Sequence, residues 1–244
     1  MRQRFSALSA IAFGLTLGAP LAYAQDPCEA NLAASRNMAQ VVSDGFAAIK
    51  AKDRAAQDKV LPQLEAAFNK LAAAEIKPVT CTNAHIDTYT PSQFTRLSLL
   101  RANGVDTGFP TDVPIVKQPR LNQENLAFAV GWIRYERTDY AIALSIFEKG
   151  LKMYPDSAEL QNEYLATLMQ LKRYADLTAA AEQFLLNSYL MTDETRAKVY
   201  QAMAIAQTNL NQKDAATQSA QVAVYYDSND STLQTQQQVT DAFK

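Results

Sequence analysis

Apolar residues recur at three- and four-residue spacing in two stretches of the chain, one near its start and one over its second half. The first stretch carries two such series, Leu32, Ala39, Val42, Phe46 and Ile49 and then Leu61, Leu64, Phe68 and Leu71. This spacing places apolar side chains on one face of a helix, so we expect a helical hairpin that turns near Lys52-Asp53. The helical period returns at Leu121 and holds to Tyr226.

The segment from Pro78 to Arg120 has a different character, because it holds five prolines and two glycines. Within it, Thr90-Pro91-Ser92-Gln93 predicts a helix start, with Thr90 as cap, Pro91 as first helical residue and Gln93 as the reciprocal capping partner. Asn103-Gly104 supplies the stop. Beyond it no periodicity remains. Ile115 and Val116 can form a short extended segment, but no sheet is expected. The segment is either a linker or a loop lying over the helices.

The clearest unit of the second half runs from Tyr140 to Pro155 and has the spacing Tyr-x2-Ala-x3-Phe-x2-Gly-x4-Pro, with Gly131 twelve residues before Ala143. Tyr140 recurs as Tyr174, 34 residues further on. This pattern resembles the tetratricopeptide repeat (TPR), whose period is 34 residues. Units are expected at about 124–157, 158–191 and 197–230, of which the second and third match the motif less well.

The motif residues have a packing explanation. Gly131 and Ala143 are small where the two helices of a hairpin cross, Phe147 fills the space between them, and Pro155 ends the second helix. The N-terminal hairpin has helical periodicity without the motif, so it is either a divergent repeat or an unrelated cap. The predicted fold class is all-α: a helical-hairpin solenoid of about three TPR-like repeats with an N-terminal disulfide-stapled helical hairpin.

The resemblance also implies where a partner binds, because the first helix of each TPR hairpin lines the concave face of the solenoid. Carried onto this sequence, it gives the partner-binding positions Asn125, Phe128, Trp132, Tyr135, Asn162, Met169 and Gln201. Phe128, Trp132 and Tyr135 form one helical stripe of the kind enriched in interface hot spots. The alternative is that this stripe packs on the N-terminal hairpin or on the proline-rich segment. The Lys/Arg and Asn clamp for C-terminal carboxylates is absent, since aromatic residues occupy its positions.

The first 24 residues have the pattern of a signal peptide. Arg2 and Arg4 precede a mostly apolar stretch from Phe5 to Leu21, and Ala22-Tyr23-Ala24 fits the rule for cleavage. An uncleaved membrane anchor is the alternative, but Gly14, Gly18 and Pro20 weaken a spanning helix. The sequence therefore predicts export to the periplasm.

Charge and composition exclude several classes of partner. Without Arg2 and Arg4, the 23 basic residues become 21 against 25 acidic ones, a net charge of −4. No basic block is present, so neither nucleic acid nor an anionic lipid surface is expected as a partner. No later apolar run is long enough to cross a bilayer.

Cys28 and Cys81 are the only cysteines and His85 is the only histidine. The cysteines bracket the predicted hairpin, whose outer ends lie together, so we expect a disulfide that staples them. A redox pair is the alternative. With both cysteines oxidised and a single histidine, no metal site, cofactor or catalytic constellation is expected. An enzyme with a site near His85 remains the least favoured hypothesis.

The predicted organisation has five parts: a cleaved signal peptide (1–24), the N-terminal hairpin (25–81), a Pro/Gly-rich connector with a short helix (82–120), the TPR-like repeats (121–230) and a capping helix (231–244). The predicted function is a non-enzymatic periplasmic adaptor or scaffold that binds a protein or peptide in a concave helical groove. The alternative is a self-associating structural subunit of an envelope assembly.

Overall fold

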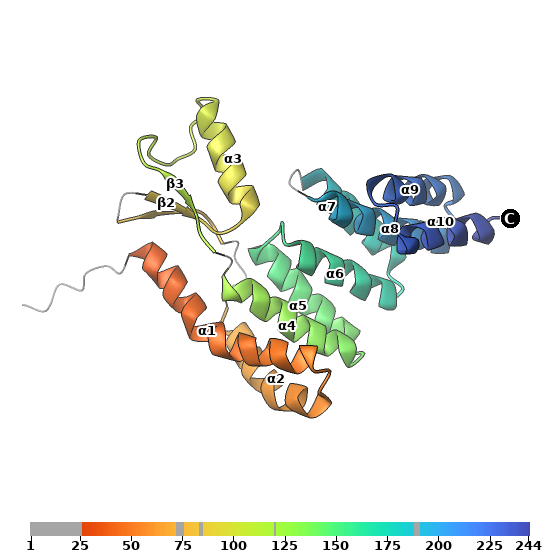
Figure 1. Ribbon diagram of the computed structural model, residues 1–244, viewed down its shortest axis with the longest axis horizontal. Helices are drawn as coiled ribbons and strands as arrows, with labels where there is room; N and C mark the ends of the chain where they lie inside the picture. Colours follow the sequence, from red (N-terminus) through yellow and green to blue (C-terminus); the bar gives the residue numbers. More distant parts are fainter. Residues whose placement is uncertain (1–25, 72–75, 83–84, 120, 188–190) are drawn as a thin grey trace, which may run out of the picture.

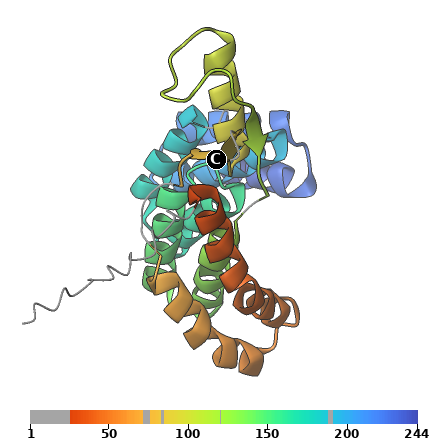
Figure 2. The ribbon, with the colours of Figure 1, turned by 90° about the vertical axis from the view of Figure 1, so that its left-hand side faces the viewer.

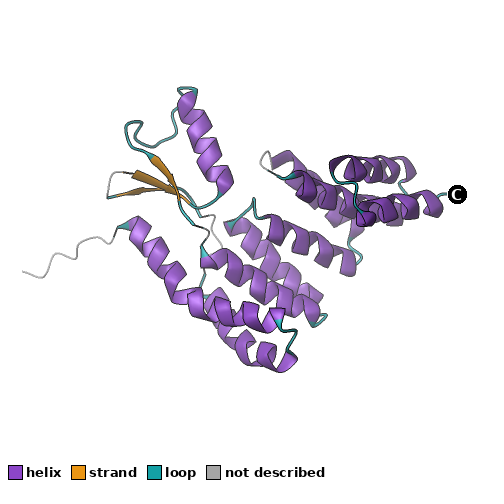
Figure 3. Cartoon of the chain, in the orientation of Figure 1, coloured by secondary structure: helices purple, strands orange, loops and turns teal. Residues whose placement is uncertain are grey.

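The computed structural model describes residues 26–71, 76–82, 85–119, 121–187 and 191–244. The predicted signal peptide lies outside these residues. Helices dominate the chain, and short strands form one small patch beside them (Figure 3). The helices are α1 (Pro27–Lys50), α2 (Arg54–Asn69), α3 (Pro91–Ala102), α4 (Asn122–Glu136), α5 (Tyr140–Met153), α6 (Ala158–Gln170), α7 (Tyr174–Asn187), α8 (Asp193–Asn209), α9 (Lys213–Tyr226) and α10 (Asp230–Ala242).

Four helical hairpins share one turn geometry. The residue two positions beyond the first helix of each hairpin has a positive φ: Lys52 (52°), Thr138 (63°), Lys172 (56°) and Asn211 (58°). The next N–H then bonds to the carbonyl five residues earlier, as in Asp139 N to Arg134 O at 3.0 Å and Asp53 N to Ala48 O at 3.3 Å. This is the Schellman arrangement. Because α1–α2 shares it with the other hairpins, the N-terminal hairpin is a unit of the same build.

The hairpins α1–α2, α4–α5, α6–α7 and α8–α9 stack in chain order (Figure 1). We call α1, α4, α6, α8 and α10 the A helices, and α2, α5, α7 and α9 the B helices. Each A helix contacts the next A helix and the B helix before it. In the described part of the chain, no comparable contact joins α2 to α5 or α5 to α7. The stack therefore curves so that the A helices line its concave face.

An α/β insert separates the first hairpin from the second. Thr138 follows Lys52 by 86 residues, whereas Lys172 follows Thr138 by 34. The insert contains β1 (Val79–Cys81), β2 (His85–Thr88), α3 and β3 (Ile115–Lys117). The three strands form a sheet of order β1-β2-β3, antiparallel between β1 and β2 and parallel between β2 and β3. Figure 2 shows the insert projecting beyond the helices.

The prediction that the connector forms no sheet is wrong. Its strands have three or four residues each, too few for a period-2 pattern to be visible. Helix α3, in contrast, begins as predicted. The Thr90 hydroxyl accepts the N–H of Gln93 at 3.2 Å, and the Gln93 side chain accepts the N–H of Tyr89 at 2.8 Å.

The motif residues pack as their sizes require. Phe147 and Ala143 are fully buried, and a Cβ built on Gly131 would lie 2.6 Å from Cζ of Phe147. The ring therefore fills the space that the missing side chain leaves. Gly45 in α1 stands seven residues before Lys52, as Gly131 stands seven before Thr138. At the other end, α10 packs against α8 and α9.

The predicted disulfide between Cys28 and Cys81 is confirmed, with a Cα–Cα distance of 5.5 Å. It joins the first turn of α1 to the last residue of β1, so it also fastens the insert to the helical stack. Asp26 strengthens this junction, because its carboxylate accepts the N–H of Cys28 at 3.1 Å and the hydroxyl of Thr82 at 2.6 Å.

Candidate partner-binding groove

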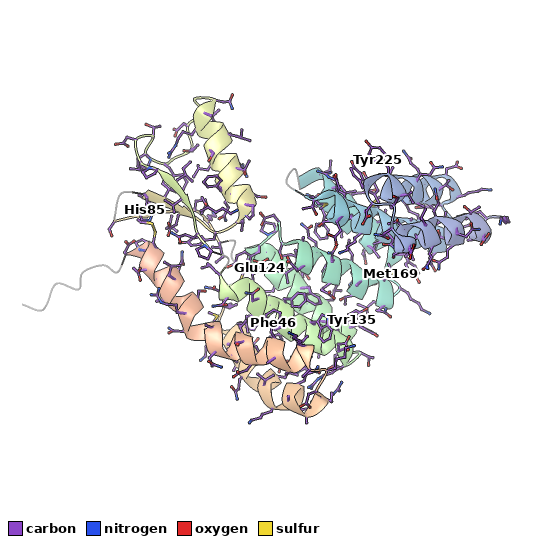
Figure 4. The ribbon with its side chains drawn as sticks, viewed as in Figure 1. Phe46, His85, Glu124, Tyr135, Met169 and Tyr225 are labelled. Carbon is purple, nitrogen blue, oxygen red and sulfur yellow. A yellow bond between two sulfur atoms is a disulfide. The ribbon has the colours of Figure 1, made fainter. Side chains whose placement is uncertain are left out.

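The concave face carries a hollow of about 180 Å³ between α1, α4 and α6. We call it the aromatic hollow; its lining residues are Phe46, Glu124, Asn125, Phe128, Ser157 and Glu159. In Figure 4, Phe46 lies on α1, and Glu124 and Tyr135 lie toward the two ends of α4. Two of the predicted positions, Asn125 and Phe128, line this hollow.

Phe128 has a second role. Its ring stacks on Phe46 with centroids 5.8 Å apart and an interplanar angle of 8°. Both rings are half-buried and pack against the core that α1, α2, α4 and α5 share. Phe128 therefore packs on the N-terminal hairpin through Phe46 and also lines the aromatic hollow.

Trp132 and Tyr135 continue the stripe along α4, and both are half-buried. The Tyr135 ring meets Tyr140 edge-on with centroids 5.2 Å apart. Burial raises the pKa of Tyr135, a hydrogen bond with the side chain of Gln170 opposes that rise, and the neighbouring Tyr140 adds to it. Tyr135 therefore packs against α5 through Tyr140 at the far end of the stripe.

The three predicted positions beyond α4 differ in their surroundings. Asn162 is half-buried on α6. Met169, also half-buried, packs against the apolar cluster formed by α6, α7 and α8. The amide of Gln201 donates to the hydroxyls of Ser231 at 2.6 Å and Thr235 at 2.8 Å. Gln201 therefore takes part in the packing of α8 on α10.

A larger hollow of about 370 Å³ lies between the insert and the N-terminal ends of α4, α6 and α8. We call it the insert hollow. Tyr89, Thr90 and Lys117 line it from the insert, and Thr192 from α8. It shares Glu124 and Ser157 with the aromatic hollow, so the two are adjacent. Together they form one groove along the A helices.

Capping bonds hold the rim of the insert hollow in place. Ser157 Oγ accepts the N–H of Leu160 at 3.3 Å and Thr192 Oγ1 accepts the N–H of Thr195 at 3.2 Å. The Asp156 carboxylate, just before α6, accepts the N–H of Ser92 at 3.2 Å. These bonds satisfy N–H groups at the starts of α3, α6 and α8. The hollow is therefore preorganised by the chain itself.

One acidic side chain on α6 has a perturbed pKa. Burial raises the pKa of Glu163, and repulsion from Glu136 on α4 raises it further. Glu136 and Glu163 also add to the raised pKa of Tyr135, so the three groups are neighbours at the C-terminal end of the stripe.

His85 lies apart from the groove. It lines neither hollow, and its Nε2 is 3.1 Å from Oδ1 of Asp87 inside the insert. Figure 4 shows it at the sheet, away from Phe46 and Tyr135.

Sequence reasoning missed Phe46 as a groove residue. The sequence does indicate this position, because Phe46 comes directly after Gly45 just as Trp132 comes directly after Gly131. The aligned turns at Lys52 and Thr138 would have placed Phe46 on the concave face. The insert residues Tyr89 and Lys117 left no comparable signal, because their place depends on how the insert folds back over the A helices.

A third hollow, of about 760 Å³, opens between α2 and α5 on the side of the B helices. Ile142 lines it and is 47% exposed. This surface offers an apolar contact outside the groove, so any binding experiment has to distinguish the two faces.

No family model matches the chain, and no curated relative does either. Two solved structures are similar to it. The NMR structure of the first TPR domain of human RPAP3 is 14% identical, with a TM-score of 0.45 over 50% of this chain and 93% of that one. The first TPR of Spaghetti (RPAP3), bound to the HSP90 peptide SRMEEVD, is 15% identical, with a TM-score of 0.43 over 49% and 92%. Among the described residues, no helix combines the length and apolarity needed to cross a bilayer.

Proposed function

We propose that this protein is a non-enzymatic adaptor of the periplasm that holds a protein or peptide partner in the groove of the A helices. The observation that carries the proposal is the aromatic hollow, where Phe46, Asn125 and Phe128 line a concavity on the inner face of the stack. Stacked hairpins present such a face to extended or helical segments of other chains.

The groove has the composition expected of a peptide site. Phe46 and Phe128 supply half-buried aromatic surface, and Asn125 supplies an amide that can hydrogen-bond to a peptide backbone. The aromatic rings are already held by their stacking and core contacts. Preorganised anchors lose little conformational entropy on binding, which favours affinity.

Site-specific photocrosslinking in cells tests this proposal. A photoreactive residue at Asn125 is expected to capture the partner, because this side chain lines the aromatic hollow. The same probe at Ala179, an exposed position on the B helix α7, serves as the matched control and should capture nothing in common with it. A probe at Ile142 tests the outer hollow.

The outcomes separate the alternatives. Adducts that form from Ile142 and not from Asn125 would move the binding surface to the B helices and refute the groove. An adduct between two copies of this chain, together with a dimer in light scattering, would instead favour a self-associating subunit. The lone tryptophan, Trp132, adds a solution readout, since it lies one helical turn beyond Phe128 on α4 and a partner bound at the aromatic hollow should shift its fluorescence emission.

A further inference from the structure

The face of the sheet that points toward α1 gathers the residues richest in metal-binding chemistry. In the antiparallel pair β1–β2, Cys81 stands opposite His85 and Val79 stands opposite Asp87. Residues opposite one another, and residues two apart on one strand, share a face. Cys81, His85 and Asp87 therefore project together, and the disulfide brings Cys28 of α1 against Cys81.

The donor atoms fall into two adjacent groups that share Cys81. A ligand atom each from Cys81, His85 and Asp87 lies within 4.8 Å of the other two, and the same holds for Asp26, Cys28 and Cys81. His85 Nε2 is 3.1 Å from Asp87 Oδ1. These groups come from α1, β1 and β2, so folding rather than local sequence assembles them.

Asp87 is the independent sign of a ligand here. The residue is fully buried, at 0% exposure. Its Oδ1 accepts a hydrogen bond from the Gln118 amide at 2.7 Å, whereas its Oδ2 has no hydrogen-bond partner in the described parts of the chain. A buried carboxylate oxygen without a partner is costly, and an ion is one of the few explanations for its retention.

We propose that reduction of the Cys28–Cys81 disulfide opens a Zn²⁺ site formed by Cys28, Cys81, His85 and Asp87. Two thiolates, one imidazole and one carboxylate are a donor set typical of tetrahedral zinc. The disulfide holds the two Cα atoms at 5.5 Å, and once it is reduced the Cys28 side chain is free to rotate toward the group that Cys81 forms with His85 and Asp87. While the disulfide is intact the sulfurs are bonded to each other, and the site is closed.

The chemistry balances with a dithiol as reductant. The dithiol gives two electrons and two protons to the disulfide and becomes a disulfide itself, which leaves Cys28 and Cys81 as thiols. Zinc then displaces the two thiol protons, so binding releases two protons into solution. The Gln118 amide donates to Oδ1 of Asp87 and so fixes the orientation of that carboxylate beside His85. The covalent link between α1 and the insert is thereby exchanged for a coordination link.

Cobalt binding to residues 25–244 tests the proposal, because tetrahedral Co²⁺ with thiolate ligands has characteristic visible and near-ultraviolet absorption. The oxidised chain should show no such absorption. The reduced chain should bind one Co²⁺, lose the absorption when Zn²⁺ is added, and release two protons per ion. Asp87→Asn and His85→Gln should each weaken binding by at least about 10-fold. Loss of a residue that only supports a metal ligand already weakens metal binding by about 10-fold or more.

The controls make every outcome decisive. Asp44→Asn, an exposed change on α1, should bind as tightly as the unaltered chain. Equal affinity for the unaltered, Asp87→Asn and His85→Gln chains would show that two thiols alone hold the metal, and would overturn the site. So would a reduced chain that binds no metal. If reduction lowers the helical circular dichroism, added zinc should restore it, and failure to do so also overturns the proposal.

Discussion

Replacing Gly131 with alanine places a methyl group against a ring that cannot move away. The new Cβ would lie 2.6 Å from Cζ and 2.8 Å from Cδ1 of Phe147, and in contact with Cε1 as well. Phe147 is fully buried between the helices of its hairpin, so no free volume receives the displaced ring. The strain therefore has to spread into the packing of α4 on α5.

The magnitude follows from two opposing effects. Alanine is favoured over glycine inside a helix by about 1 kcal/mol. Overpacking a dense core costs about 1–3 kcal/mol, and overlap with three ring atoms points to the upper end. We expect Gly131→Ala to lower the free energy of unfolding by about 2 kcal/mol. Urea unfolding followed by circular dichroism at 222 nm measures this difference.

Gly45→Ala is the matched control, since Gly45 holds the equivalent position in α1. Its Cβ would meet Cδ1 of Leu64 at 3.0 Å and Cδ2 at 3.2 Å, the ends of a flexible side chain. The gain in helix propensity should then offset the contact, and stability should change little. In a Phe147→Leu background, Gly131→Ala should lose most of its cost. If Gly131→Ala is neutral, or costs the same in both backgrounds, the account of this crossing is wrong.

Three further predictions concern the turns, the disulfide and the acidic pair. Thr138→Gly should stabilise the protein by about 1 kcal/mol in urea unfolding, because a left-handed φ of 63° is strained for a β-branched residue; a destabilised variant would contradict this. Cys28→Ser with Cys81→Ser should cost about 4 kcal/mol, the loop-entropy estimate for a separation of 53 residues, and an unchanged melting temperature would refute it. Glu163→Gln should stabilise the protein at pH 7 and lose this advantage at acidic pH. The raised pKa of Glu163 means that the folded state binds its proton more tightly, so ionisation above that pKa destabilises the fold; a constant difference across pH would argue against this origin.

The helices and their partners in the repeats could be predicted because each carries its signal locally. The start of α3 at Pro91 follows from Thr90 and Gln93, and the crossing of α4 and α5 follows from Gly131 and Phe147. The disulfide followed from two cysteines at the ends of one hairpin. Each of these inferences needed only residues near in sequence, or a hairpin that brings its own ends together.

The sheet and its metal-binding cluster could not be predicted, because both depend on register between separate segments. Ile86 pairs with Ile115 across α3 and the loop that follows it, and no periodic pattern marks either strand. In the sequence His85 and the two cysteines stand out individually. Asp87 joins them in one cluster only when β1 and β2 are aligned. Phe46 lies between these two cases. Its place on the concave face could have been inferred by aligning the turn at Lys52 with the turns of the other hairpins.

The insert links these separate features to the proposed function. It forms one wall of the groove through Tyr89 and Lys117, and its position depends on the bond between Cys28 and Cys81. Asp87, in the cluster beside that bond, is only two residues before Tyr89 on the wall. A change in the chemistry of the cluster would therefore reach the groove through a single short strand, without passing through the helical stack. Binding that needs the wall should then weaken in the double serine variant, whereas binding confined to the aromatic hollow should not.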